Sequence, residues 1–228
     1  LWLSLIALFP VVLSALIYLT ERTKAASKMS YIAKQLITGI MFGGLAILGT
    51  EFGIKIDGAI INARDASPIC AGLLFGAPAG IIAGIIGGVE RWLAVIWGAG
   101  EYTQLACSVS TVLAGAFAAA LRKYMFDNKK PKWYYCLAIA VITEIVHMLM
   151  IFLTNMNDVR TAFSFVRICS LPMIAVNGLA VMLAGALLSL LSVREHKTAH
   201  HDLKNISQSF QRFLLVCVTA GFLMTTVF

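Results

Sequence analysis

The chain has 228 residues, of which 60% are hydrophobic and only 13% are charged, and its mean hydropathy of +0.87 excludes a soluble globular domain. Its 18 Lys and Arg outnumber its 11 Asp and Glu, but most of this excess lies in short gaps between apolar runs. Such placement is typical of helices oriented in a bilayer and not of a nucleic-acid partner. The runs are continuous and about 20 residues long, whereas barrel strands alternate over about ten. We therefore predict an all-α integral membrane protein.

Eight apolar runs bounded by charge predict a polytopic helical bundle of about seven to eight spans. They cover residues 1–19, 31–50, 58–76, 78–97, 104–121, 133–154, 170–192 and 210–228. Only Ala77 and Pro78 stand between the third and fourth runs, and proline ends or kinks a helix. Two kinked spans and a re-entrant hairpin over 58–97 therefore both remain open.

The runs divide the chain into three parts. Residues 1–30 form a first helix and its loop, residues 31–192 a transmembrane bundle, and residues 193–228 a polar connector followed by a further helix. The first run lacks a basic leading segment and a cleavage site, so we expect a retained helix and not a signal peptide. Because the chain starts at Leu1 and stops at Phe228 within an apolar run, we expect it to be part of a longer protein.

Basic residues predict the orientation of the bundle. They follow the first, fifth and seventh runs, as Arg22, Lys24, Lys28, Arg122, Lys123, Lys129, Lys130, Lys132, Arg194, Lys197 and Lys204. With eight spans, or with a re-entrant pair, these three gaps lie on one face, which the positive-inside rule makes cytoplasmic.

Glycine recurs every four residues on both sides of Pro78, at Gly72, Gly76, Gly80, Gly84 and Gly88. Small residues on one stripe let membrane helices approach closely and pack by dispersion. We predict a helix-packing role for these glycines and Pro78. The alternative is that glycine and alanine are simply common in membrane helices.

Four short stretches carry a resemblance to a known family. They are Gly53-Ile-Lys-Ile-Asp57, Asn62-Ala-Arg-Asp65, Ala71-Gly-Leu-Leu-Phe-Gly-Ala-Pro-Ala-Gly80 and Gly84-Ile-Ile-Gly-Gly-Val-Glu-Arg-Trp92. Together they resemble the signature of the LytS-type five-transmembrane receptor domain, in which a polar loop leads into glycine-rich helices closed by an arginine. The layout resembles the family over about 31–192, and Ala77 and Glu90 depart from its pattern.

The resemblance implies a membrane input module of bacterial sensor proteins, placed ahead of a kinase, cyclase or phosphatase domain. It implies that some members respond to small metabolites such as pyruvate and others to the state of the envelope. The layout also resembles the substrate-binding subunits of energy-coupling-factor vitamin transporters, which supplies the alternative function.

Five polar side chains within the apolar runs are the candidate ligand-binding residues: Arg64, Arg91, Glu144, His147 and Asn177. Charged groups in a membrane are costly unless they are paired or wet, so each marks a functional position. In the predicted topology all five converge on a cavity that opens outward. Paired N–H donors of the two arginines would bind a small anion.

A structural interpretation of the same residues remains open. Arg64 would pair with Asp65 or Asp57, Arg91 would pair with Glu90 or reach lipid headgroups, and Glu144 would pair with His147.

Other chemistry has little support in the sequence. We find no HExxH motif, no Ser/His/Asp set and no CxxC pair, and so expect no catalytic residue, no metal site and no cofactor. His196 and His200, and the stretch from His201 to Asn205 that resembles a phosphoacceptor box, are better explained as a basic connector.

The sequence thus predicts a multi-pass sensory input domain of the bacterial cell membrane. It would bind a small carboxylate-like anion and relay the change to an output domain outside this chain. We expect no enzyme activity of this chain itself. Small-residue stripes offer an interface for a homodimer, and packing within one chain is the alternative use of the same stripes. The alternative is a transport subunit that captures a solute in the same cavity.

Overall fold

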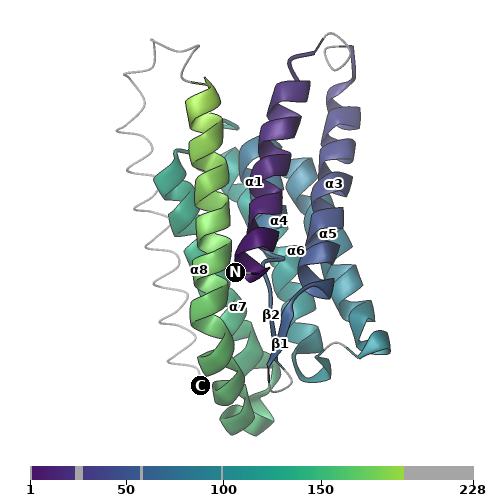
Figure 1. The fold of residues 1–228 in the computed structure, drawn as a ribbon, viewed down its shortest axis with the longest axis vertical. Helices are drawn as coiled ribbons and strands as arrows, with labels where there is room; N and C mark the ends of the chain where they lie inside the picture. Colours follow the sequence, from purple (N-terminus) through teal and green to yellow (C-terminus); the bar gives the residue numbers. More distant parts are fainter. Residues whose placement is uncertain (1, 24–27, 57–58, 99, 193–228) are drawn as a thin grey trace.

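The computed structural model describes residues 2–23, 28–56, 59–98 and 100–192, which form an elongated bundle of helices with a small hairpin toward one end (Figure 1). In chain order the elements are α1 (Trp2–Thr20), α3 (Tyr31–Glu51), β1 (Ile54–Ile56), β2 (Ala59–Ile61), α4 (Ala66–Cys70) with a π-helical turn (Ala71–Phe75), α5 (Ala77–Leu93) with a 3-10 turn (Ala94–Trp97), a 3-10 turn (Glu101–Thr103), α6 (Gln104–Tyr124), α7 (Trp133–Thr154), a 3-10 turn (Met156–Asp158) and α8 (Val159–Ser192).

Five helical segments of the described chain are long and apolar enough to cross a membrane. They are Tyr31–Glu51, Ala77–Trp97, Glu101–Tyr124, Trp133–Thr154 and Met156–Ser192, and two shorter apolar helices cover Leu5–Thr20 and Ala66–Phe75. The expected seven to eight spans are therefore not confirmed. The predicted connector and last run, 193–228, lie outside the described residues.

The main difference from the expected spans concerns residues 58–76. Here β1 and β2 pair antiparallel, with Ile54 opposite Ile61, as suits β-branched residues. The helix that follows covers only Ala66 to Phe75, so it is about 15 Å long at 1.5 Å per residue, half of a hydrocarbon core of about 30 Å. Hydropathy alone does not distinguish a strand followed by a short helix from one continuous span.

Contacts with α3 define the path of this segment. A Cβ at Gly49 would meet the Arg64 backbone at 2.8 Å, whereas Gln35, close to the start of α3, donates from Nε2 to Phe75 O at 3.1 Å. The segment from Arg64 to Phe75 therefore runs antiparallel to α3. Gln35 Oε1 accepts from Ala79 N at 3.2 Å, which ties the start of α5 to the same place.

The chain reverses direction at Gly76. A Cβ there would overlap the Gln35 amide, so the close approach requires glycine. Pro78 stands in the first turn of α5, where its missing N–H leaves no helical hydrogen bond unmade. From this point α5 runs parallel to α3.

The five glycines that recur every four residues from Gly72 to Gly88, here called the glycine ladder, do not form one stripe on one helix. The reversal at Gly76 folds their two halves against each other. A Cβ at Gly80 would lie 2.5 Å from Gly72 Cα, across the turn. Gly84 and Gly88 face α6, since Cβ atoms there would lie 3.1 Å from Thr111 O and 2.8 Å from Ser108 O. These glycines let α5 approach the π-helical turn and α6 at backbone distance.

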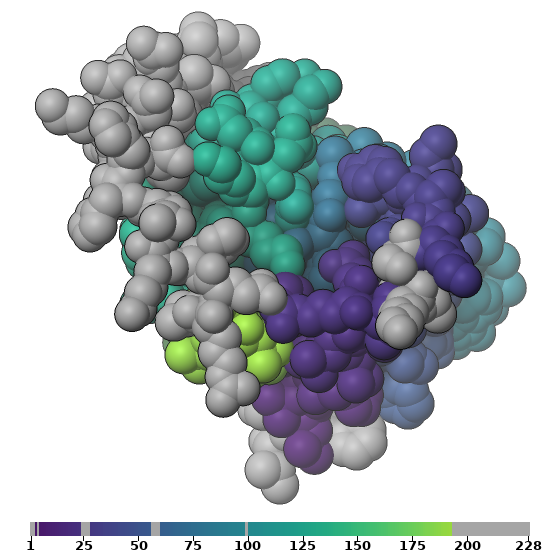
Figure 2. Space-filling model, turned by 90° about the horizontal axis from the view of Figure 1, so that it is seen from above, coloured from purple at the N-terminus to yellow at the C-terminus, as the bar shows by residue number. Residues whose placement is uncertain are grey.

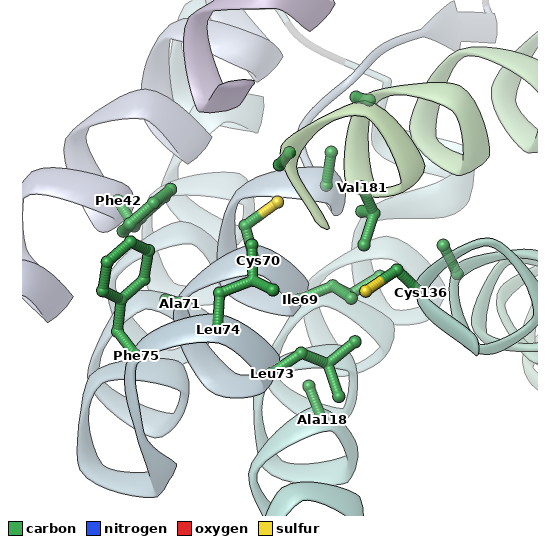
Figure 3. Packing of buried hydrophobic residues seen from close by; sticks show 14 of the residues in the cluster. Phe42, Ile69, Cys70, Ala71, Leu73, Leu74, Phe75, Ala118, Cys136 and Val181 are labelled. Atoms are coloured by element: carbon green, nitrogen blue, oxygen red, sulfur yellow. The ribbon is translucent and has the colours of Figure 1, made fainter. Parts of the chain in front are cut away.

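The short helix α4 lies at the centre of the bundle, where it contacts α1, α3, α5, α6 and α8. Figure 3 shows the side chain of Phe75 next to that of Phe42, and their ring centroids are 5.6 Å apart. Ile69 and Leu73 extend toward Cys136 on the other side. The polar segment just before α4 is therefore carried into the core.

Basic side chains gather at one end of the bundle, here called the basic end. The guanidinium of Arg22 and the ammonium of Lys130 lie 4.4 Å and 4.2 Å from the centroid of the Tyr18 ring, and Arg122 Nη1 donates to Leu73 O at 2.7 Å. Figure 2, which views the molecule from above, shows the ends of α1 and α8 side by side on this face. Two of the three predicted basic gaps thus lie at the same end.

Candidate functional site: a buried charge cluster

Asn177, which is buried in α8, holds the segment between β2 and α4 in place. Its Nδ2 donates to Asn62 O at 3.2 Å, and its Oδ1 accepts from Ala66 N at 2.9 Å, an amide that the start of a helix leaves unpaired. Asn62 Oδ1 in turn accepts from Arg64 N at 3.2 Å. These contacts of Asn177 position the backbone beside Arg64.

Replacing Asn177 by alanine is expected to lower the free energy of unfolding by about 1–3 kcal/mol, because buried backbone groups lose their partners. The measurement is thermal unfolding in detergent. Asn155→Ala, at the part-buried end of α7, is the matched control and is expected to have a smaller effect. Equal effects of the two changes would contradict this role.

Arg64 is 0% exposed and forms the centre of a polar network. Its Nε donates to Thr111 Oγ1 at 2.7 Å and to Asp65 Oδ1 at 3.2 Å, and Thr111 Oγ1 donates to the same Asp65 oxygen at 2.7 Å. Nη1 is 3.5 Å from Thr50 Oγ1. Nη2 has no hydrogen-bond partner among the described residues. Arg64 therefore pairs with Asp65 and keeps one N–H group available.

His147 of α7 links this pair to two further groups. Its Nδ1 lies 2.8 Å from Asp65 Oδ2 and 3.6 Å from Glu144 Oε2, while its Nε2 lies 3.3 Å from Cys107 Sγ on α6. Neither carboxylate oxygen of Glu144 has a hydrogen-bond partner among the described residues, although the side chain is 0% exposed. We call Arg64, Asp65, Cys107, Glu144 and His147 the charge cluster.

Arg91 lies at the end of α5, next to the charge cluster. Its Nη2 donates to Gly100 O at 2.7 Å and to Thr103 Oγ1 at 3.2 Å, and it also interacts with Cys107. It thus contacts the start of α6 and does not reach for headgroups. Glu90, which we did not include in the site, is also buried and lies within electrostatic range of Arg64.

The structure therefore brings Arg64, Glu144 and His147 together, with Arg91 adjacent and Asn177 supporting the backbone. Asp65 enters as the direct partner of Arg64, as the structural interpretation allowed, whereas Asp57 lies outside the described residues. The sequence did not indicate that Thr111 and Cys107 belong to the site. An uncharged residue in an apolar run carries no signal until the fold places it beside a charge.

A cavity of about 290 Å³ reaches the charge cluster between α6 and α7. Its polar lining comes from Ser110, Thr143 and His147, and the rest is apolar. Buried charges cost several kcal/mol each unless they are paired, so the five ionisable groups at the centre of this membrane bundle make the charge cluster the candidate functional site. The fold and the cluster together define a class, the multi-pass helical membrane domain with a polar site in its core.

The family description "5TMR of 5TMR-LYT" matches residues 17–190, and the chain belongs to this family of membrane receptor domains. The expected resemblance is thereby confirmed. The chain is a multi-pass protein of the bacterial inner membrane.

Curated relatives agree with this assignment. The sensor histidine kinase BtsS of Escherichia coli is 28% identical over 142 residues, which are 60% of this chain and 24% of the relative. The sensor histidine kinase YpdA of the same organism is 26% identical over 125 residues, 54% of this chain and 21% of the relative. The sensor protein LytS of Staphylococcus haemolyticus is 31% identical over 162 residues, 68% of this chain and 26% of the relative.

The matches span about a quarter of the length of these relatives. This chain corresponds to the sensory membrane domain, and the kinase domain of the relatives lies beyond the matched part. No solved structure matches the chain.

Proposed function

We propose that this chain is the sensory input domain of a bacterial signal-transduction protein and that it binds a small carboxylate at Arg64 and Arg91. The observation that carries the proposal is the buried Arg64 guanidinium, whose Nη2 has no hydrogen-bond partner among the described residues. A guanidinium forms two parallel hydrogen bonds with a carboxylate, so an anion would use the N–H group that Asp65 leaves unpaired. The nearby cavity of about 290 Å³ is lined by His147 of the charge cluster and by neither arginine.

Binding would act on the fold through Asp65. A ligand carboxylate on Nη2 would place a second negative charge beside Asp65 and weaken its pairing with Arg64, and both residues directly precede α4, which packs against α5 and α6. Weaker pairing of Arg64 with Asp65 would therefore shift the central helix between two packings. A change at the core would reach α8 through Asn177 and, from its end, an output domain outside this chain.

The experiment uses the full-length protein in lipid vesicles and measures phosphorylation of its output domain with and without two- to four-carbon carboxylates. We expect at least one carboxylate to change the rate in the wild type and to have no effect on Arg91→Gln. Arg160→Gln, which removes an exposed arginine at the start of α8, is the control and should respond like the wild type. A wild-type rate that ignores every carboxylate would refute the proposal.

The transport subunit is the weaker candidate. The relatives that match are sensor proteins, and none of the observations above favours solute release over signalling.

A further inference from the structure

The charge cluster contains three potential metal ligands on one side of Arg64. Asp65, Glu144 and His147 each offer a donor atom, and these atoms lie within 4.8 Å of one another. They come from two separate parts of the chain, the segment before α4 and the middle of α7. We propose that they form a binding site for one divalent transition-metal ion, such as Zn²⁺.

The first argument is that the donor atoms are the atoms that the fold leaves without hydrogen bonds. Both carboxylate oxygens of Glu144 are buried without a hydrogen-bond partner in the described chain, and Asp65 Oδ2 and His147 Nδ1, which contact each other at 2.8 Å, form no hydrogen bond of good geometry. Unpaired buried polar atoms are costly. A cation placed between the three side chains would satisfy all of them at once.

The second argument is the spacing of the donors. His147 Nδ1 lies 2.8 Å from Asp65 Oδ2 and 3.6 Å from Glu144 Oε2. Around a metal with bonds of about 2.0–2.2 Å, neighbouring ligand atoms lie about 2.8–3.1 Å apart in an octahedron and about 3.3–3.6 Å apart in a tetrahedron. The shorter distance matches an octahedron and the longer one a tetrahedron, and all donor atoms lie within 4.8 Å of one another, so side-chain shifts would bring them into one geometry.

The third argument is the environment of His147. The ring nitrogen that faces away from the carboxylates lies 3.3 Å from Cys107 Sγ, and metal-binding histidines usually make such an outer contact with the second nitrogen. His147 and Thr143 also line the cavity between α6 and α7, so the imidazole borders an open space whose other walls are mostly apolar.

The donor set indicates the class of metal. One imidazole and two carboxylates suit Zn²⁺, Mn²⁺ or Fe²⁺, whereas Ca²⁺ and Mg²⁺ prefer oxygen donors alone. Two carboxylates balance the charge of one divalent ion, and Arg64 stays paired through the other oxygen of Asp65. The competing occupant of the same position is a proton on His147.

The test measures Zn²⁺ binding to the full-length protein in detergent after treatment with a chelator. We expect one equivalent of Zn²⁺ per chain and a higher Tm with Zn²⁺ alone, without any carboxylate. Glu144→Gln and His147→Gln are each expected to weaken binding at least about tenfold. Size-exclusion elution of the metal-free variants establishes that they are folded.

Two controls locate the ion. Glu90→Gln removes a buried carboxylate of α5 that lies outside the donor set and should bind Zn²⁺ like the wild type. The double variant His196→Gln, His200→Gln removes a histidine pair in the connector and should also retain binding.

Three results would overturn the metal site. The first is no Zn²⁺ binding by the folded wild type, which favours the proton on His147. The second is unchanged binding by both Glu144→Gln and His147→Gln. The third is loss of binding only in the connector variant. Because Zn²⁺ is the sole probe, each result leaves the carboxylate proposal to its own experiment.

Discussion

Replacing Asp65 by alanine is expected to lower the free energy of unfolding by about 3–5 kcal/mol, because it leaves the Arg64 guanidinium buried without its counter-charge. The loss includes the hydrogen bond from Thr111 and the contact with His147, which reach the same carboxylate. Unfolding of the purified protein in mixed micelles with increasing SDS measures the change.

A double variant separates the charge effect from a general disturbance of the core. Arg64→Met combined with Asp65→Leu removes both charges and keeps apolar volume, so it should be more stable than Asp65→Ala alone. Asp158→Ala is the matched aspartate control at an exposed turn. Asp158 Oδ1 accepts from Thr161 N at the start of α8, and losing this cap is expected to cost about 0.5–2 kcal/mol, less than Asp65→Ala. If Asp65→Ala lowered the free energy of unfolding no more than Asp158→Ala does, the Arg64–Asp65 ion pair would not stabilise the fold.

The second large effect is expected at Gly80. A Cβ there would lie 2.5 Å from Gly72 Cα and 3.0 Å from Gly115 O, and these are backbone atoms that cannot rotate away. Gly80→Ala must therefore push α5 from the π-helical turn and from α6, at a cost of about 1–3 kcal/mol. Thermal unfolding in detergent measures this cost.

Gly44 on α3 provides the control for this substitution, since a Cβ there has no atom within 4 Å. Gly44→Ala is expected to leave stability unchanged or slightly raised, because alanine favours the helix. A similar loss of stability in both variants would show that Gly80 is not required for the close packing of α5.

Charge within apolar runs was the signal that located the site from sequence. Arg64, Glu144 and His147 stand out because ionisable groups are rare in membrane helices, and the fold brings them together. Thr111 and Cys107 give no such signal, and their part depends on the packing of α6 against α4. Pairing across helices is a tertiary property that spacing along one helix does not reveal.

The fold, like the site, could be predicted from the sequence only in part. The five long helices follow from hydropathy, but hydropathy leaves open whether 58–76 is a full span or part of a re-entrant hairpin, because isoleucines are equally apolar in a strand and in a helix. The four-residue spacing of the glycine ladder predicts one stripe. Pro78 marks a break in the sequence, but it does not show that the chain reverses there. Contacts of Gly80 with Gly72 exist only after that reversal.

The proposed site also explains why the polar segment before α4 lies in the core. Asn177 supports its backbone, Thr111 and His147 hold Asp65, and Arg64 retains an unused N–H group. A purely structural ion pair would need none of the additional ionisable groups. The arrangement supports a site whose pairing changes with a ligand.

The most direct test of the central claim is the Tm of the full-length protein in detergent, measured with and without two- to four-carbon carboxylates. A ligand that binds only the folded state at a concentration of 100 times its Kd adds about 2.7 kcal/mol of stability. We expect at least one carboxylate to raise the Tm of the wild type and to leave that of folded Arg64→Gln unchanged. An equal rise in both proteins, or no rise with any carboxylate, would contradict an anion site at Arg64.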